Sequence, residues 1–296
     1  MSLSTALVLG AGGQLGQACI AAAPPEFSVR GLSKSECDLT DLHAVRRCLG
    51  DMAPAVVINA AAFTAVDVAE SQPQLAEAIN ATGPTMLAAM CAEQGIRLVH
   101  VSTDFVFDGS AASPYGPEAT PSPLGVYGAS KLRGEQGVTA GGASYAIVRT
   151  SWVYAPTGRN FLLTMLRLMR EQGVVRVVND QIGSPTAAHT LAAVCWALAT
   201  HTQAQGLFHW SDRGAITWYD FACAIAEDAL ELGLLDAPAR VEPIATQEYP
   251  TPAERPAYSV LDSTATCEAL GMTQRPWREA LRDVLGSLLL AERESL

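Results

Sequence analysis

The stretch that decides the fold is Thr5-Ala6-Leu7-Val8-Leu9 followed by Gly10-Ala11-Gly12-Gly13-Gln14-Leu15-Gly16. A short apolar run meets a glycine-rich turn, and a helical pattern follows over residues 14–22. Glycines at this spacing permit a tight turn and let the backbone approach a pyrophosphate, while the helix N-terminus offers free N–H groups. The order of strand, turn and helix therefore predicts a dinucleotide site rather than a glycine-rich turn without a ligand.

Apolar runs and helical patterns alternate from this turn to residue 150. We expect strands at residues 5–9, 27–32, 55–59, 97–102 and 145–150, and helices at 14–22, 42–49, 73–81, 84–93 and 127–137. Such alternation implies right-handed crossovers and a parallel sheet, and near-continuous apolar strands imply that both faces are covered. The predicted fold is α/β, a Rossmann-type doubly wound parallel sheet, with residues 1–150 as an NAD(P)-binding domain.

The pattern changes after Trp152. Helices are expected at 161–172, 185–200, 218–232 (capped by Thr217), 263–270 and 277–294, with a short strand at 176–179 and a loop at 242–255. We interpret residues 151–296 as a smaller mixed α/β region that is mainly substrate-binding and interleaved with the first domain.

Composition excludes several classes of function. The net charge of −11 and pI near 4.9 argue against nucleic-acid binding, which needs a basic face. Seven scattered cysteines form no CxxC pair, so a zinc or redox motif is not expected, and reduced thiols in a cytoplasm fit the spacing. No apolar run is long enough for a signal peptide or a membrane span. The five histidines lack metal-ligand spacing, and no metal site is predicted.

The expected cofactor site begins in the glycine turn, with contacts from Gly10, Gly12, Gly13, Gln14, Leu15 and Gly16. The end of the second strand commonly reads the 2′-position of the adenosine ribose, where an acid favours NAD and a basic residue favours NADP. Leu32-Ser33-Lys34 offers no acid, whereas Arg30 and Lys34 lie nearby. NADPH is therefore favoured, with NADH as the alternative; the other interpretation is that both cations are solvated surface charges.

Two further segments are candidates for the cofactor. Asp38 and Leu39 are interpreted as lying against the adenine, while Asp41 is at least as well explained as a helix cap. Ala60, Ala61 and Ala62 follow the third strand, where small side chains leave room for a ligand at the carboxyl ends of the strands.

Thr103, Tyr127 and Lys131 have the side chains that carbonyl reduction needs. Thr103 lies just past a strand, and Tyr127 and Lys131 lie four residues apart on one helix face. A tyrosine supplies a proton most readily when its pKa is below ~10, and a nearby ammonium lowers that pKa. We expect Tyr127 to be the general acid, Thr103 to polarise the carbonyl, and Lys131 to lower the pKa of Tyr127 and hold the nicotinamide ribose. An ordinary i,i+4 surface pair is the alternative.

These residues resemble the extended short-chain dehydrogenase/reductases and, among them, the dTDP-4-dehydrorhamnose reductase family. The resemblance covers nearly the whole chain. It rests on the glycine turn and on VINAAAFTAVDVAE (57–70), VSTDFVFDG (101–109), PLGVYGASKLRGE (123–135), AIVRTSWVY (146–154), NDQIGSPT (179–186) and RPAYSVLD (255–262).

The resemblance implies reduction of the C4 carbonyl of dTDP-4-dehydro-6-deoxy-L-mannose to dTDP-L-rhamnose, with Thr103, Tyr127 and Lys131 as the triad. It also implies a dTDP-sugar partner and substrate contacts from Asp67, Thr103, Asp104, Phe105, Trp152, Asn160 and Arg255. Phe105 stands where the family has tyrosine, which removes one hydroxyl. The alternatives are that Trp152 is a core aromatic and that Arg255 is an exposed loop cation. Pairing of the Arg255 guanidinium with a diphosphate is the more specific hypothesis.

Two other functions stay open at this point. One is a catalytically idle NADP-binding regulatory subunit of the methionine adenosyltransferase type, which the intact triad disfavours. The other is a related NAD-dependent sugar-nucleotide epimerase. A dehydratase would need an acid pair after the threonine, and Asp104 is followed by Phe105. Some relatives form dimers through Mg²⁺, but those ligands do not map onto this chain, so a homodimer and a role for Mg²⁺ are left open.

Overall fold

A six-stranded parallel sheet forms the frame of the computed structural model, which describes residues 3–294. The strand order is β10-β5-β4-β3-β1-β2. The strands are β1 (Ser4–Leu9), β2 (Phe27–Leu32), β3 (Val56–Asn59), β4 (Arg97–Thr103), β5 (Tyr145–Thr150) and β10 (Gly206–His209). From β1 the chain builds outward to β2 on one side and then through β3, β4 and β5 on the other. The direction of winding reverses beside β1, which is where open α/β sheets bind ligands.

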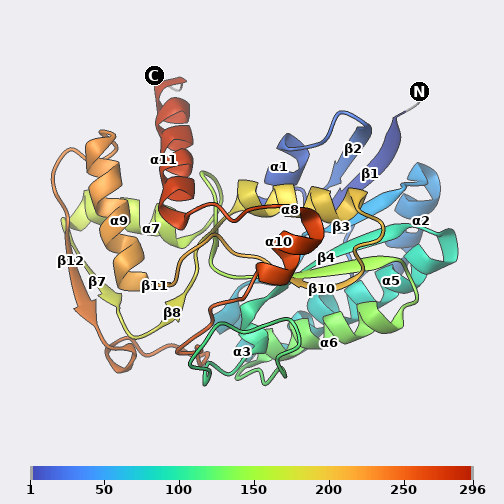
Figure 1. Cartoon of the computed structure of the whole chain (residues 1–296), viewed down its shortest axis with the longest axis horizontal. Coiled ribbons are helices and arrows are strands. Elements are labelled where there is room, and N and C mark those ends of the chain that lie inside the picture. Colours follow the sequence, from blue (N-terminus) through green and yellow to red (C-terminus); the bar gives the residue numbers. More distant parts are fainter. Residues whose placement is uncertain (1–2, 295–296) are drawn as a thin grey trace.

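Helices cover both faces of this sheet (Figure 1). Side chains alternate along β1, so Ala6 and Val8 face α1 (Gln14–Ala21) and α8 (Ala188–Thr200). Leu7 and Leu9 face the opposite layer, which contains α2 (Leu42–Met52), α5 (Gly83–Gln94) and α6 (Val126–Ala140). The side chains of residues 6–9 of β1 are all buried, which explains the near-continuous apolar sequence of the strand. The predicted doubly wound sheet is confirmed.

The connection from β3 to β4 places residues near the carboxyl ends of the strands. It contains α3 (Val66–Ser71), α4 (Pro73–Glu77), a π-helical turn at Ala78–Thr82 and α5, so the two expected helices run on through the π turn. Within that turn, buried Asn80 accepts from the Phe63 N–H at 2.8 Å and donates to the Phe63 carbonyl at 3.0 Å. A short 3₁₀ turn, Asp104–Val106, follows β4.

The second half of the chain forms a lobe with its own core (left in Figure 1). The lobe contains α7 (Phe161–Gln172), β7 (Val174–Val178), α9 (Trp218–Glu231), β12 (Arg240–Ile244) and α11 (Trp277–Glu294). Smaller elements are β6 (Val153–Tyr154), β8 (Ile182–Gly183), β9 (Thr186–Ala187), β11 (Ile216–Thr217), α10 (Thr264–Leu270) and a 3₁₀ turn at Thr246–Glu248. The expected cap is present, because the Thr217 hydroxyl accepts from the Asp220 N–H at 3.0 Å and the Asp220 carboxylate accepts from the Thr217 N–H at 2.9 Å.

Two expected elements differ from the structure and one strand was not expected, in each case because pairing with a distant strand decides the structure. The loop expected at 242–255 begins as strand β12, which pairs in parallel with β7; Pro243 is tolerated there because β12 is an edge strand. The helix expected at 185–200 begins at Ala188, since residues 186–187 pair with β6. Strand β10 was not predicted. It pairs with β5, so residues 188–209 return to the first sheet although they follow residue 150.

Across residues 3–294, none of the helices combines the length and the apolar character that crossing a membrane requires.

Candidate active site

The ends of β1, β2 and β3 surround a cavity of about 310 Å³. Its lining consists of Gly10, Gly12, Gly13, Lys34, Cys37, Asp38, Leu39, Ala60, Ala61, Ala62, Phe63 and Ile79. The structure thus brings together most of the residues expected at the cofactor. Gln14, Leu15 and Gly16 do not line it, because they lie in α1 behind the turn. Gly13 caps α1 with no side-chain partner, so the helix N-terminus keeps free N–H groups beside the cavity.

Gly10 is required by the shape of this cavity. Its φ is +80°, and a Cβ added there would lie 2.7 Å from the Ala61 backbone nitrogen. A side chain would be strained and would push the turn away from the end of β3. The close backbone approach and the small alanine side chains leave the cavity open, which fits a dinucleotide.

The segment after β2, which borders the cofactor cavity, contains a carboxylate that the sequence analysis did not consider. Glu36 folds back on the end of β2, where its carboxylate accepts from the Ser33 N–H at 2.9 Å and the Ser33 hydroxyl at 2.8 Å. The Ser33 hydrogen bonds hold the pKa of Glu36 below its ordinary value. Arg30 lies 3.7 Å from Glu36 and Lys34 lies 3.8 Å from Asp38. Both cations expected near a 2′-phosphate therefore already face carboxylates.

Two acids in the next segment have separate structural tasks. Asp38 accepts from the Thr40 N–H at 2.9 Å and from the Thr40 hydroxyl at 2.8 Å. Asp41 accepts from the His43 and Ala44 N–H groups, each at 3.0 Å, and so caps α2. The capping interpretation of Asp41 is confirmed.

Thr103 and Tyr127 meet at the carboxyl end of β4. Thr103 is the last residue of the strand, and its side chain lies close enough to Tyr127 to lower the pKa of the phenol. Tyr127 is fixed by the start of α6, where the Val126 N–H donates to the Glu70 carboxylate at 2.8 Å. A Cβ on Gly128 would clash with the Phe105 carbonyl oxygen, so glycine lets α6 approach the turn after β4.

The Tyr127 ring lies between the two candidate ligand sites. Phe63, which lines the cofactor cavity, packs in the same cluster. Phe105, which lines the larger cavity described below, contacts the ring edge-to-face with centroids 5.6 Å apart. Burial raises the pKa of Tyr127 to about 12, and the nearby Thr103 side chain opposes that rise.

Burial, Thr103 and Asp104 shift the pKa of Tyr127, so the expected lowering by Lys131 stays a prediction. Lys131 is buried, and its Nζ donates to the Val101 carbonyl oxygen at 2.6 Å. Burial lowers the pKa of Lys131 to about 8, although Glu135 opposes that shift. A phenol with a high pKa is protonated near neutral pH, which is the form that a reduction requires.

Asp104 is a second unusual group beside the triad. It is buried, and burial raises its pKa to about 6. The Thr103 hydroxyl donates to Asp104 Oδ1 at 3.1 Å, and Thr103 and the nearby Ser259 oppose the rise in the pKa of Asp104. Asp104 Oδ2 is buried without a hydrogen-bond partner. A partner from a ligand would satisfy this oxygen, because buried polar atoms are nearly always paired.

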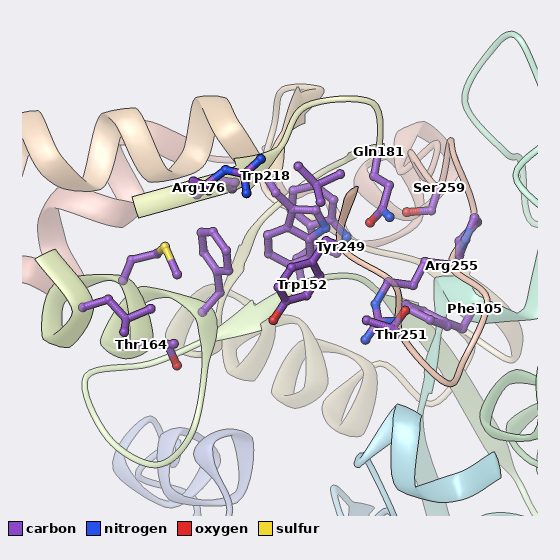
Figure 2. A pocket seen from close by; sticks show the side chains of 16 residues that line it. Phe105, Trp152, Thr164, Arg176, Gln181, Trp218, Tyr249, Thr251, Arg255 and Ser259 are labelled. Atoms are coloured by element: carbon purple, nitrogen blue, oxygen red, sulfur yellow. The ribbon is translucent and has the colours of Figure 1, made fainter. Parts of the chain in front are cut away.

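The larger cavity, of about 390 Å³, lies in the second lobe (Figure 2). Trp152 and Trp218 form its centre, with stacked rings whose centroids lie 3.5 Å apart. Trp152 has a φ of +47°, which is rare for a bulky residue and marks stored backbone strain. Its indole also packs so closely on Gly183 that a Cβ there would lie 2.5 Å from the ring. Trp152 therefore lines the cavity and is not a closed core aromatic.

Arg255 lies at the other end of this cavity, next to Phe105 and Thr251 (Figure 2). Arg255 Nη2 lies 2.7 Å from Asp67 Oδ2, and the arginine holds the pKa of Asp67 below its ordinary value. Arg255 Nη1 also donates to the Thr251 hydroxyl and, at 3.1 Å, to the Ala253 carbonyl. Asp67 thus reaches the cavity through Arg255, and it orients a cation whose side chain is one-quarter exposed.

Of the seven expected substrate residues, Phe105, Trp152 and Arg255 line the larger cavity, whereas Asp67, Thr103, Asp104 and Asn160 do not. Asn160 caps α7 by accepting from the Leu163 N–H at 2.9 Å, and its Nδ2 donates to Gln14 Oε1 at 2.8 Å. Asn160 therefore fastens the second lobe to the first turn of α1 and is not among the residues that line the larger cavity.

Sequence reasoning missed much of this lining. The unpredicted members are Phe161, Thr164, Met165, Leu168, Arg176, Val177, Val178, Gln181, Trp218, Tyr249, Thr251, Pro256 and Ser259. Gln181 and Ser259 lie in the segments NDQIGSPT and RPAYSVLD, which the resemblance had already marked as substrate-side. The aromatic members gave no signal, because an aromatic residue at helical spacing is more often part of a core.

Within residues 3–294, no three His, Cys, Asp or Glu side chains gather in a way that could hold a metal ion.

Comparisons with known proteins agree with this geometry. A family model described as the RmlD substrate binding domain matches residues 4–290. A dTDP-4-dehydrorhamnose reductase of Mycobacterium tuberculosis is 43% identical over 290 residues, covering 95% of this chain and 92% of that protein. The spore coat polysaccharide biosynthesis protein SpsK of Bacillus subtilis is 40% identical over 285 residues, covering 96% and 97%. The crystal structure of dTDP-4-dehydrorhamnose reductase from Bacillus anthracis in complex with NADP matches with a TM-score of 0.90 and 36% identity, covering 96% and 99%.

The chain therefore belongs to the dTDP-4-dehydrorhamnose reductase (RmlD) family and is an NAD(P)H-dependent oxidoreductase of that family.

Proposed function

We propose that the chain reduces the C4 carbonyl of dTDP-4-dehydro-6-deoxy-L-mannose to dTDP-L-rhamnose, with NADPH as the reductant. The observation that carries this proposal is the position of Tyr127. Tyr127 packs in one cluster with Phe63, which lines the dinucleotide cavity, and edge-to-face on Phe105, which lines the larger cavity. A proton donor at that place can serve a carbonyl that faces both ligands.

Each residue of the triad has a distinct task in this proposal. A nicotinamide dinucleotide in the glycine-lined cavity supplies the hydride. Tyr127 donates its phenolic proton to the oxygen that develops negative charge, and Thr103 donates a hydrogen bond that orients the same oxygen. Lys131 holds the nicotinamide ribose hydroxyls. Gly10, Gly12, Gly13, Asp38, Leu39 and Ala60–Ala62 line the dinucleotide site, and Gln14, Leu15 and Gly16 support it from α1.

Residues around the larger cavity would hold the sugar nucleotide. Arg255, aligned by Asp67, pairs with the diphosphate through its guanidinium, which matches phosphate oxygens in geometry. Trp152 and Trp218 provide a flat apolar wall, and Phe105 closes the side next to Tyr127. Asp104 offers its unpaired oxygen to a sugar hydroxyl. Asn160 acts indirectly, by joining the lobe to α1.

The choice between NADPH and NADH rests on the end of β2. Lys34 lines the cavity and favours a 2′-phosphate. Glu36 opposes that preference, because its carboxylate occupies the Ser33 N–H and hydroxyl that a phosphate would use. We therefore propose use of both cofactors, with NADPH preferred. The relative from Bacillus anthracis was solved with NADP.

A different sugar substrate is the competing proposal within the family. SpsK is named for spore coat polysaccharide biosynthesis, and its match covers 96% of this chain, compared with 95% for the rhamnose reductase. Beyond reduction, an idle regulatory subunit would bind NADPH without turnover, and an epimerase would retain stoichiometric NAD through purification. The presence of Thr103, Tyr127 and Lys131 in the chain favours catalysis over the idle subunit.

The seven cysteines are all free, and burial raises the pKa of the Cys91 thiol to about 12. Inert reduced thiols support a reducing compartment such as the cytoplasm as the place of work. A homodimer remains a proposal that light scattering on the purified chain would test.

The direct test is NADPH oxidation with dTDP-4-dehydro-6-deoxy-L-mannose made in place by the enzymes that precede it. We expect substrate-dependent loss of NADPH and formation of dTDP-L-rhamnose. NADPH binding without turnover would favour the regulatory subunit. Turnover with the C4 epimer as product would overturn the stereochemical part of the proposal.

A further inference from the structure

The helix that carries Tyr127 begins without a cap of its own. Gly125 is the N-cap residue of α6 and has no side chain that could accept from the first N–H groups of the helix. Glu70, in α3, supplies an acceptor from another part of the chain, because its Oε1 accepts from the Val126 N–H at 2.8 Å. Val126 and Tyr127 are the first two residues of α6, so this hydrogen bond holds the turn from which the phenol projects.

The close approach of Glu70, and not the backbone, requires a glycine at residue 125. Gly125 has an extended backbone (φ −134°, ψ 176°), which every L-residue can adopt. A Cβ built there would lie 2.6 Å from Glu70 Oε1 and 3.7 Å from Glu70 Cδ, and among residues 3–294 it would meet no other atom within 4 Å outside the adjacent residues. The carboxylate ends a flexible side chain, so a Cβ would displace it at little steric cost and release the Val126 N–H.

A second acid of the same short helix binds the substrate side. Asp67, one turn before Glu70 in α3, accepts from the Ala253 N–H at 3.2 Å and lies 2.7 Å from Arg255 Nη2. Helix α3 lies beside α6 (Figure 1). One helix of six residues therefore binds the start of α6 with one carboxylate and the loop of the proposed diphosphate cation with the other.

We propose that Glu70 is a positioning residue for the reduction, because by capping α6 from α3 it fixes the place of the Tyr127 phenol relative to the bound sugar nucleotide. This inference rests on the proposed function, in which Tyr127 donates the proton. A general acid must lie within about 2.6–3.2 Å of the atom that it protonates, so a small shift of the first turn of α6 slows the proton transfer. Glu70 lines neither cavity, and its loss should therefore change the rate and not the binding of either ligand.

The two acids of α3 separate positioning from a general structural role. If α3 were only a spacer, loss of either carboxylate would loosen the helix and change kcat and KM together. If Glu70 positions Tyr127 and Asp67 orients Arg255, the two variants should divide the parameters between them. Glu70→Ala should lower kcat, and Asp67→Asn should mainly raise the KM for the sugar nucleotide.

We expect Glu70→Ala to lower kcat about 10- to 100-fold, the scale on which a small misplacement of reacting groups acts. The KM values for the sugar nucleotide and for NADPH should stay close to those of the unmodified chain. Glu77→Ala is the matched control, because Glu77 in α4 also binds α6, through an exposed contact of 2.8 Å from Arg133 Nε, and should leave kcat unchanged. All rates are measured well below the Tm of each variant. An unchanged kcat in Glu70→Ala, or a KM that rises as much as kcat falls, would overturn the proposal.

Gly125→Ala tests the same contact from its other side. Its Cβ displaces the Glu70 carboxylate, so this variant should lose about as much of kcat as Glu70→Ala although it removes no functional group. In the double variant Glu70→Ala/Gly125→Ala there is no carboxylate to displace, and the second substitution should add no further loss. Losses that multiply in the double variant would mean that the two residues act independently, and would refute the proposal.

Two further variants should restore the cap. Glu70→Gln keeps an acceptor oxygen without the charge and should retain most of kcat. Gly125→Ser places a capping hydroxyl on α6 itself, so it should lower kcat in the unmodified chain, where it meets Glu70, but raise kcat in the Glu70→Ala background. If Glu70→Gln lost as much as Glu70→Ala and the serine restored nothing, the hydrogen bond to Val126 would not be what positions Tyr127.

The position of Tyr127 can also be followed without substrate. Protein labelled with ¹³C at tyrosine Cζ contains seven tyrosines, and Tyr127→Phe assigns the resonance of Tyr127. We expect this resonance to shift in Glu70→Ala and in Gly125→Ala, in the same direction, and to stay in place in Glu77→Ala. A Tyr127 resonance that stays in place in the first two variants would overturn the proposal. If the unmodified chain did not turn over the sugar nucleotide, the proposed function would fail, while this measurement would still decide whether Glu70 positions Tyr127.

Discussion

The proposed dinucleotide cavity and the proposed substrate cavity are built in different ways. The dinucleotide cavity is made mostly of backbone, at the ends of three neighbouring strands, with Gly10 and Ala61 in close approach. The substrate cavity is made of side chains that come from positions as distant as Phe105 and Ser259. A backbone site needs particular small residues at fixed spacing, whereas a side-chain site needs only that the fold bring suitable groups together.

The difference also appears in how the charges are arranged. Cations and acids at the edge of the dinucleotide cavity are mostly solvated, as in the Arg30–Glu36 pair. At the substrate cavity, the Arg255 side chain is mostly buried and is oriented by Asp67 through a 2.7 Å contact. We therefore expect substitutions around the substrate cavity to raise the KM for the sugar nucleotide strongly. Substitutions at the edge of the dinucleotide cavity should change the preference between NADPH and NADH only slightly.

The largest effect is expected where the cavities meet. Tyr127→Phe should lower kcat about 10²–10⁴-fold, because general-acid catalysis typically contributes that much. NADPH affinity, measured by fluorescence titration, should remain. Tyr219→Phe is the matched control, because Tyr219 is a half-buried residue of α9 that lines neither cavity. Unchanged turnover in Tyr127→Phe would contradict the role of Tyr127 as general acid.

A smaller effect is expected at the cation of the substrate cavity. Arg255→Ala should raise the KM for the sugar nucleotide about 10- to 100-fold, since a hydrogen bond to a charged group contributes about 1.5–3 kcal/mol. The KM for NADPH should stay nearly constant. Arg240→Ala, in an exposed pair of the same lobe, is the control. Equal rises for both ligands would mean that Arg255 supports the lobe as a whole and does not bind the diphosphate.

The aromatic wall should contribute less than the cation. Trp218→Leu removes a stacked partner of Trp152, and aromatic pairs contribute about 0.5–1.5 kcal/mol, which corresponds to about a 2- to 10-fold rise in KM for the sugar nucleotide. Trp218→Phe should recover part of the loss. If both variants behaved like the unmodified chain, the wall would be a structural feature without contact to substrate.

The smallest effect is expected at the edge of the dinucleotide cavity. Glu36→Gln removes an exposed carboxylate from Ser33 and should shift the preference toward NADPH about 2- to 5-fold, the range of a surface charge pair. The ratio of kcat/KM for NADPH and NADH measures it, with the exposed Glu26→Gln as control. A shift toward NADH would show that Glu36 does not compete with the 2′-phosphate.

The same contrast explains what could be read from the sequence. The glycine turn, the buried strands and the Tyr127–Lys131 spacing are local patterns, so the sheet and most of the dinucleotide cavity were predictable. Strand β10 and β12 were not, because each has four or five residues and depends on pairing with a distant strand.

The substrate side was predictable only through resemblance, and the resemblance did not indicate the structural contacts of its residues. Asn160 caps α7 and binds Gln14, a contact that spacing along the chain does not reveal. Glu36 was missed because it reaches back to Ser33 across the turn after β2. The high pKa of Tyr127 follows from burial, which depends on the whole fold.

The most direct test of the central claim follows the hydride itself. NADPH carrying deuterium at the transferable position of the nicotinamide would be incubated with the chain and dTDP-4-dehydro-6-deoxy-L-mannose, and the product examined by NMR. The account predicts one deuterium at C4 of dTDP-L-rhamnose, and loss of that transfer in Tyr127→Phe. Product without deuterium, or deuterium at another carbon, would contradict it.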